Sequence, residues 1–215
     1  MTAAFAYHPL FASSAVQVTA HRIGTSWQWY IIRGAGFAAA ALLVLLMISG
    51  IGQVTGLTFR LIAPVKAWMI HKALAIALCV AIAAHVFFLL VDKFMPFSLS
   101  QILVPFASNY TNGTKVWGIA LGSLAVTLGV LAMYSVAIIV ASSLGWIDSK
   151  KKTWRWLHYL SYFVMFAVFV HALYVGSDLK YGTFRTAWIV LIIVVLALVI
   201  GRLRRAGSLR RRNGE

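Results

Sequence analysis

Hydrophobic residues run in long unbroken blocks along most of this chain, instead of alternating with polar ones. Each block is about 20 residues long, which is the length that an α-helix needs to cross the hydrocarbon core of a bilayer. Glycine, proline and charged residues separate the blocks and mark helix ends. The pattern predicts an all-α integral membrane protein with five transmembrane helices, or six if the N-terminal piece forms a further segment. The expected spans are residues 30–51, 67–91, 116–141, 156–176 and 186–200.

The composition strengthens this prediction. The chain is 62% hydrophobic and only 11% charged, whereas soluble domains are about half apolar and about a quarter charged. Its net charge of +15 would indicate nucleic-acid binding in a soluble protein. Here most basic residues flank the spans or lie in the tail, so membrane topology and anionic lipid explain the charge, and no nucleic acid is expected. The single cysteine, Cys79, excludes a disulfide within the chain and a cysteine metal site.

The basic residues also predict an orientation. With five spans, thirteen Lys and Arg residues share one side with the C-terminus, and six lie on the other side. The positive-inside rule places the thirteen in the cytoplasm, so the C-terminus is expected inside a bacterial-type cell membrane. Three parts follow: residues 1–28 as a tail outside or on the membrane surface, 29–205 as the membrane domain, and 206–215 as a basic cytoplasmic tail.

Four histidines lie within two of the expected spans. His71 and His85 are fourteen residues apart in the second span, and His158 and His171 are thirteen apart in the fourth. Polar groups in hydrocarbon are costly and usually have a function. The two spans run parallel, so His71 and His158 share the cytoplasmic level and are called the inner pair. His85 and His171, called the outer pair, are displaced from them by roughly 20 Å along the helices.

The two spacings differ in the direction in which they aim the side chains. Fourteen residues leave about 40° between His71 and His85, which therefore face nearly the same way. Thirteen residues leave about 140° between His158 and His171 in an ideal helix. We therefore expect a local tightening or widening of the fourth helix, or side-chain rotamers that reach sideways, near residues 159–165.

One imidazole from each of two facing helices suits haem iron with two axial histidines. Zinc or copper would need three or four close ligands, and a proton path would need carboxylates within the spans. We therefore expect two stacked b-type haems that carry electrons, with axial pairs His71/His158 and His85/His171. Two alternatives stay open: a haem-free transporter or assembly factor with structural histidines, and a protein with a single haem.

Anionic haem propionates would attract basic residues at the ends of the spans. Arg33 lies at the expected outer level, and Lys72 and Arg155 lie at the inner level. These three are the candidate propionate partners. Snorkelling to the interface is the alternative for Arg33, and for Lys72 and Arg155 it explains the position equally well. Phe163, Met165 and Phe166 fall between the two levels in sequence and are expected to serve packing first. No catalytic residue is assigned.

The residues around the histidines resemble the ferric reductase-like transmembrane domain, which is shared by ferric reductases and NADPH oxidases. The segments that carry the resemblance are Met69-Ile70-His71-Lys72 with His85, Trp156-Leu157-His158-Tyr159 with Val170-His171-Ala172, and Ile32-Arg33-Gly34-Ala35. The last is similar to an arginine motif that lies beside the outer haem in that family. The resemblance covers about residues 29–205.

This resemblance implies a b-type cytochrome that passes electrons across the membrane. The donor would be a separate flavoprotein reductase or quinol on the cytoplasmic side, and the acceptor would be ferric iron or a periplasmic redox partner. The chain departs from the larger relatives in having Leu89 where NADPH oxidases have a further histidine. Because no glycine-rich nucleotide motif occurs in these residues, we also expect no flavin or nicotinamide domain of its own. Its architecture is similar to small bacterial relatives that feed a periplasmic methionine sulfoxide reductase. The basic residues 150–155 are expected to dock an acidic reductase or lipid headgroups.

Overall fold

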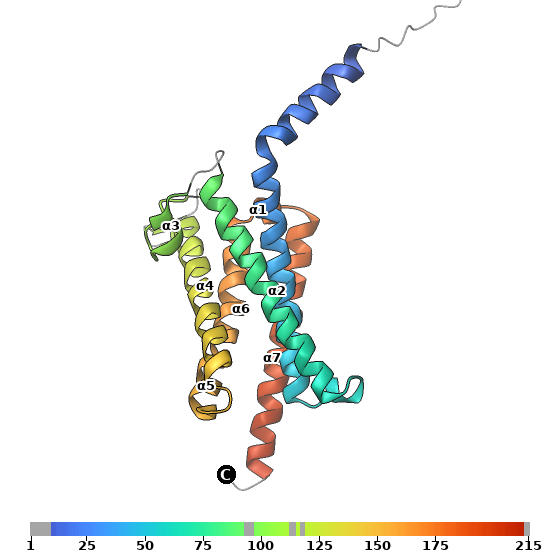
Figure 1. Ribbon diagram of the computed structural model, residues 1–215, viewed down its shortest axis with the longest axis vertical. Coiled ribbons are helices and arrows are strands. Elements are labelled where there is room, and N and C mark those ends of the chain that lie inside the picture. Colours follow the sequence, from blue (N-terminus) through green and yellow to red (C-terminus); the bar gives the residue numbers. More distant parts are fainter. Residues whose placement is uncertain (1–9, 93–96, 112–114, 117–118, 213–215) are drawn as a thin grey trace, which may run out of the picture.

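A computed structural model describes residues 10–92, 97–111, 115–116 and 119–212, with side chains outside 10–26, 115–116, 119, 203 and 205–212. The described chain is a helical bundle with one small hairpin (Figure 1). Its elements are α1 (Leu10–Val54), η1 (Thr58–Arg60), α2 (Pro64–Val91), α3 (Leu99–Leu103), β1 (Lys115–Val116), β2 (Ile119–Ala120), α4 (Leu121–Gly145), α5 (Lys151–His158), α6 (Leu160–Val175), η2 (Ser177–Leu179) and α7 (Thr183–Arg212).

Five segments of the described chain are long and apolar enough to cross a membrane, as expected from the sequence. They are Trp27–Val54, Pro64–Val91, Leu121–Gly145, Lys151–Val175 and Thr183–Arg202. The protein is therefore a multi-pass membrane protein with a helical bundle. Two boundaries differ from the expectation. Helix α1 continues N-terminally to Leu10 and leads away from the bundle (Figure 1). The third span begins at Leu121, because the residues before it pair as the antiparallel strands β1 and β2.

The helices associate as two antiparallel pairs. Helix α1 packs along α2 and α4 packs along α6, whereas contacts between the two pairs are few. Buried apolar side chains of α1, α4, α6 and α7 form a shared core, which includes Leu43, Val136, Val164 and Val195. Figure 1 shows the two pairs side by side, with α7 next to them. This division matters because α2 carries His71 and His85, whereas α5 and α6, which both contact α4, carry His158 and His171.

The connection between α2 and α4 folds back over the start of α4. Helix α3 begins with a capping box, in which the Ser98 hydroxyl accepts from the Gln101 N–H and the Gln101 side chain accepts from the Ser98 N–H. The Tyr134 hydroxyl on α4 donates to the Leu103 carbonyl at 2.7 Å. The Phe106 N–H donates to the Thr127 hydroxyl at 3.0 Å. Side chains of α4 thus satisfy main-chain groups of this connection and hold it in place.

The fourth span is two helices that meet at Tyr159. The Tyr159 N–H lies 3.2 Å from both the Arg155 and the Trp156 carbonyls, and the Tyr162 N–H donates to the Tyr159 carbonyl at 3.1 Å. Bonds to the residue three positions back tighten a helix and change the direction of later side chains. The predicted irregularity between His158 and His171 is confirmed at Tyr159. The basic segment from Lys151, expected as a loop, forms α5 instead.

Candidate functional site

The structure brings His71 on α2 and His158 at the end of α5 close together. Their ring centroids are 6.4 Å apart and the ring planes are inclined by 46°. Two imidazoles on opposite sides of one metal ion, with metal–nitrogen bonds of about 2 Å, place their centroids roughly 6 Å apart. The separation of the inner pair is therefore the one that two axial ligands of a single iron require.

The surroundings of the inner pair come from α1, α4 and α5. His71 Nδ1 lies 3.3 Å from the Ser49 hydroxyl on α1. The Trp154 ring lies beside the His158 ring, with centroids 5.3 Å apart, and its Nε1–H donates to the Ser143 hydroxyl on α4 at 3.0 Å. Trp154 thus ties the end of α5 to α4 and holds the His158 ring from one side. Within the described residues, His158 Nδ1 is buried without a hydrogen-bond partner.

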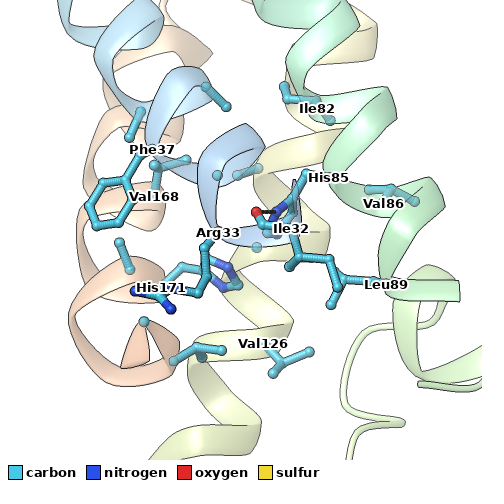
Figure 2. Close-up of a pocket in the computed structure, with 18 of the residues that line it drawn as sticks. Ile32, Arg33, Phe37, Ile82, His85, Val86, Leu89, Val126, Val168 and His171 are labelled. Atoms are coloured by element: carbon cyan, nitrogen blue, oxygen red, sulfur yellow. Dashed lines mark hydrogen bonds between the residues drawn. The ribbon is translucent and has the colours of Figure 1, made fainter. Parts of the chain in front are cut away.

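The outer pair lines a cavity of about 400 Å³ between the two helix pairs. Figure 2 shows His85 coming from α2 and His171 from α6, with apolar side chains such as Phe37, Ile82 and Val168 around them. Cavities of this size and mostly apolar lining, with few polar groups, are typical of small-molecule and cofactor sites. The cavity extends inward to Leu43, Leu78 and Val136, near the middle of the bundle.

Main-chain carbonyls hold both rings of the outer pair. His85 Nδ1 lies 2.9 Å from the Ile32 carbonyl on α1, shown as the dashed line in Figure 2, and His171 Nδ1 lies 2.8 Å from the Ala125 carbonyl on α4. A carbonyl can only accept, so Nδ1 must carry the hydrogen, and Nε2 keeps its lone pair in the neutral ring. Metal-bound histidines commonly donate from the other nitrogen in this way. The two rings are thus prepared to bind a metal through Nε2.

Three of the four histidines are held by the neighbouring helix of their own pair, while the cavity lies between the pairs. His71 and His85 contact α1, and His171 contacts α4. A group held by one histidine from each side would therefore join the two helix pairs. In the described part of the chain no three His, Cys, Asp or Glu side chains gather to hold an ion. Each level offers two imidazoles, which is the donor set of a haem with two axial histidines.

Arg33 lies at the cavity of the outer pair and has an acidic partner that the sequence analysis did not identify. Its Nε–H donates to Asp178 Oδ2 at 2.7 Å, and its Nη2 donates to Asp178 Oδ1. Both side chains line the cavity, and Figure 2 shows Arg33 on α1 among the residues that line it. The signal for this partner was present, because Asp178 is one of only four acidic residues and follows a span on the side expected for Arg33.

The other two predicted propionate partners lie on the surface at the inner level. Lys72 is exposed, with its ammonium 5.3 Å from the Trp68 ring centroid, and Arg155 is exposed on α5. Their binding role stays a prediction. The structure adds a further cation near the inner level, Arg202 on α7. Its guanidinium lies 5.4 Å from the ring centroid of Tyr162, a residue one helical turn after His158. Met165 is buried in the core, whereas Phe166 is 60% exposed and is not part of the core.

Comparisons with known proteins identify a family for this chain. No curated protein and no solved structure matches the chain significantly. The family model of the ferric reductase like transmembrane component matches residues 35–170, which include His71, His85 and His158 and end one residue before His171. This match covers well over half of the 215 residues. Together with the five spans and the paired histidines, it places the chain in the ferric reductase like transmembrane component family.

Proposed function

We propose that this protein is a b-type cytochrome that carries electrons across the membrane through two haems. One haem would be held by the inner pair, His71 and His158, and the other by the outer pair, His85 and His171. The observation that carries the proposal is the pairing of these imidazoles at two levels between two helix pairs, with 6.4 Å between the inner rings and a cavity between the outer ones. Membership of the ferric reductase like family supports it.

The residues around the paired histidines suit haem in two respects. A porphyrin has apolar faces, and the outer cavity is lined mainly by aliphatic and aromatic side chains. Its iron takes two axial nitrogens, and each level offers one imidazole from each helix pair. Bound haem supplies reversible one-electron exchange, and two axial histidines leave no open position on the iron. The proposed role is therefore electron transfer rather than oxygen chemistry.

The chain's own residues would orient the cofactor and exclude water. The Ile32 and Ala125 carbonyls fix the outer rings with Nε2 free, and Ser49 and Trp154 hold the inner rings. Buried apolar side chains that line the cavity, such as Leu43, Val136 and Val164, would exclude water from it. Arg33, paired with Asp178, lies where a carboxylate at the edge of the cavity would meet a positive charge.

We further propose that the C-terminus lies in the cytoplasm of a cell membrane, so that electrons enter at the inner pair. The donor would be a separate flavoprotein or quinol, and the acceptor would be ferric iron or a redox protein outside. The exposed basic residues of α5, together with the exposed Arg204 of α7, would meet an acidic donor or lipid headgroups. Accessibility of single cysteines placed at residues 150 and 181, in a Cys79→Ala background, tests the orientation: only the second should react in intact cells.

The experiment that tests the function is the haem-to-protein ratio of the purified chain, from reduced-minus-oxidised spectra. A ratio near two with b-type absorption bands is the expected result. A ratio near one would mean that one pair does not hold haem, and single histidine variants would show which. Protein without haem, purified from cells well supplied with it, would refute the proposal and leave the histidines as polar contacts between helices.

A further inference from the structure

Three glycines face three of the four histidine rings, at distances that form a graded series. A Cβ built on Gly129 of α4 would lie 2.6 Å from His171 Nδ1, and one on Gly36 of α1 would lie 3.2 Å from His85 Cε1. A Cβ on Gly50 would lie 3.6 Å from His71 Cε1, which is ordinary van der Waals contact. Distances below 3 Å require something to shift, and distances of 3.0–3.4 Å are tighter than most Cβ contacts. Of these three rings, the two of the outer pair need a glycine opposite them, whereas the His71 ring does not.

These same two rings bind main-chain carbonyls, and the carbonyls lie four residues before the glycines. His85 Nδ1 bonds to Ile32, and 32 plus four is Gly36; His171 Nδ1 bonds to Ala125, and 125 plus four is Gly129. In an α-helix the side chain at position i+4 lies over the carbonyl of residue i. Helix α4 itself shows this, since the Ser135 hydroxyl reaches the Leu131 carbonyl at 2.8 Å and the Thr127 hydroxyl reaches the Ser123 carbonyl at 3.0 Å.

We propose that Gly36 and Gly129 are positioning residues, which uncover the Ile32 and Ala125 carbonyls so that the outer imidazoles can bind them. A methyl group at either glycine would occupy the space that the ring now fills. In the inner pair, the ring of His71 is held differently. Its Nδ1 contacts the Ser49 hydroxyl instead of a helix carbonyl, so the ring stays farther from Gly50. The device explains how each ring of the outer pair presents Nε2 to the cavity. For the ligand that Nε2 would bind, the inference rests on the proposed function.

The test is a double-mutant cycle on thermal stability, which needs no bound haem. Gly129→Ala and Gly36→Ala should each lower the melting temperature by several degrees, the first more than the second. The loss should vanish when the facing ring is absent, that is, in His171→Ala and His85→Ala backgrounds. Gly34→Ala is the matched control on α1, because a Cβ added at Gly34 meets no other part of the described structure within 4 Å, apart from its own helix backbone and chain neighbours. Gly50→Ala, at ordinary contact distance, should also be tolerated.

The cycle has clear contrary outcomes. If Gly36→Ala or Gly129→Ala costs as much without the facing histidine as with it, the glycines serve helix packing alone and the inference is wrong. An equal loss from Gly34→Ala would overturn it as well. Should Gly129→Ala fail to fold, Gly36→Ala decides the matter, because among the described residues the atoms within 4 Å of its added Cβ are His85 atoms.

A redox measurement separates the inference from the proposed function. If the protein carries haem, Gly36→Ala should raise the midpoint potential of the outer haem alone, because a weaker Nδ1–H bond makes the imidazole less basic. An unchanged outer potential would contradict the positioning role. If the wild-type protein carries no haem while the stability cycle gives the expected coupling, the electron-transfer proposal fails and the positioning of the rings by Gly36 and Gly129 stands.

Discussion

Arg33 on α1 and Asp178 in η2 form a two-pronged ion pair across 145 residues of sequence, at the cavity that the outer histidines line. The arginine side chain is 35% exposed and the aspartate 21%. Exposed ion pairs add little to stability, because water screens them. The Arg33–Asp178 pair matters for another reason. It places one positive and one negative charge beside the proposed outer haem, and each charge should influence the reduction potential of the iron.

Removing the negative charge of Asp178 and removing the positive charge of Arg33 should shift the midpoint potential of the outer haem in opposite directions. Asp178→Asn leaves Arg33 unneutralised, which favours the reduced iron and should raise the potential by tens of mV, the order expected for one charge at such distances. Arg33→Gln should lower it by a similar amount. Potentiometric titration of the haem absorption checks both variants. Asp148→Asn, an exposed acid before α5, is the control and should change neither value. Shifts of the same sign in the two charge variants would contradict this view.

Single histidine variants should remove haem one level at a time. His171→Ala or His85→Ala should leave about one haem per chain, held by the inner pair, because a haem with one axial ligand is held weakly. His71→Ala or His158→Ala should leave the outer haem. The pyridine haemochrome assay gives the ratio, and His21→Ala, which lies before the first span, should retain two. Loss of all haem from a single variant would show that the two sites assemble together or that only one exists.

The hydroxyl of Ser49 should matter to the inner haem only. His71 Nδ1 lies 3.3 Å from this oxygen, so Ser49→Ala removes the partner of an axial ligand and should raise the inner midpoint potential by a few tens of mV. Ser135→Ala is the matched control, because the Ser135 hydroxyl binds a carbonyl of its own helix. Redox titration should show a shift in one of two components. A shift of both components would mean that Ser49 acts through the bundle as a whole.

Much of the fold followed from one-dimensional rules. Apolar runs of membrane length predicted the five spans, and 3.6-residue periodicity predicted the irregularity between His158 and His171. These properties depend on neighbours in sequence. The Arg33–Asp178 pair and the contact between Trp154 and Ser143 join residues of different helices, so they depend on how helices pack, which no local pattern encodes.

The glycines opposite the histidines could be predicted only in part. Their spacing can be read from the sequence, but it has a meaning only when the packing of the helices is known. Gly36 and Gly50 are 14 residues apart, since 50 minus 36 is 14, and so are His71 and His85, since 85 minus 71 is 14. Helices α1 and α2 run antiparallel, so the two spacings coincide when the helices pack and each glycine meets one histidine. The matching spacings therefore indicate a site only once the packing of α1 against α2 is known.

The tight turn at Tyr159 should determine where His171 points, and an insertion tests this directly. One alanine inserted between Leu160 and Ser161 rotates the rest of α6 by about 100° and moves it by about 1.5 Å. His171 would then leave the Ala125 carbonyl and the cavity, whereas His158 lies before the insertion and keeps its place beside His71 and Trp154. The expected product holds one haem with the potential of the inner site. An alanine inserted after Gly182, in the turn before α7 and beyond all four histidines, should retain both haems. If the first insertion also retained both, α6 would be able to re-register around the extra residue, and the turn at Tyr159 would not be what aims His171 at His85.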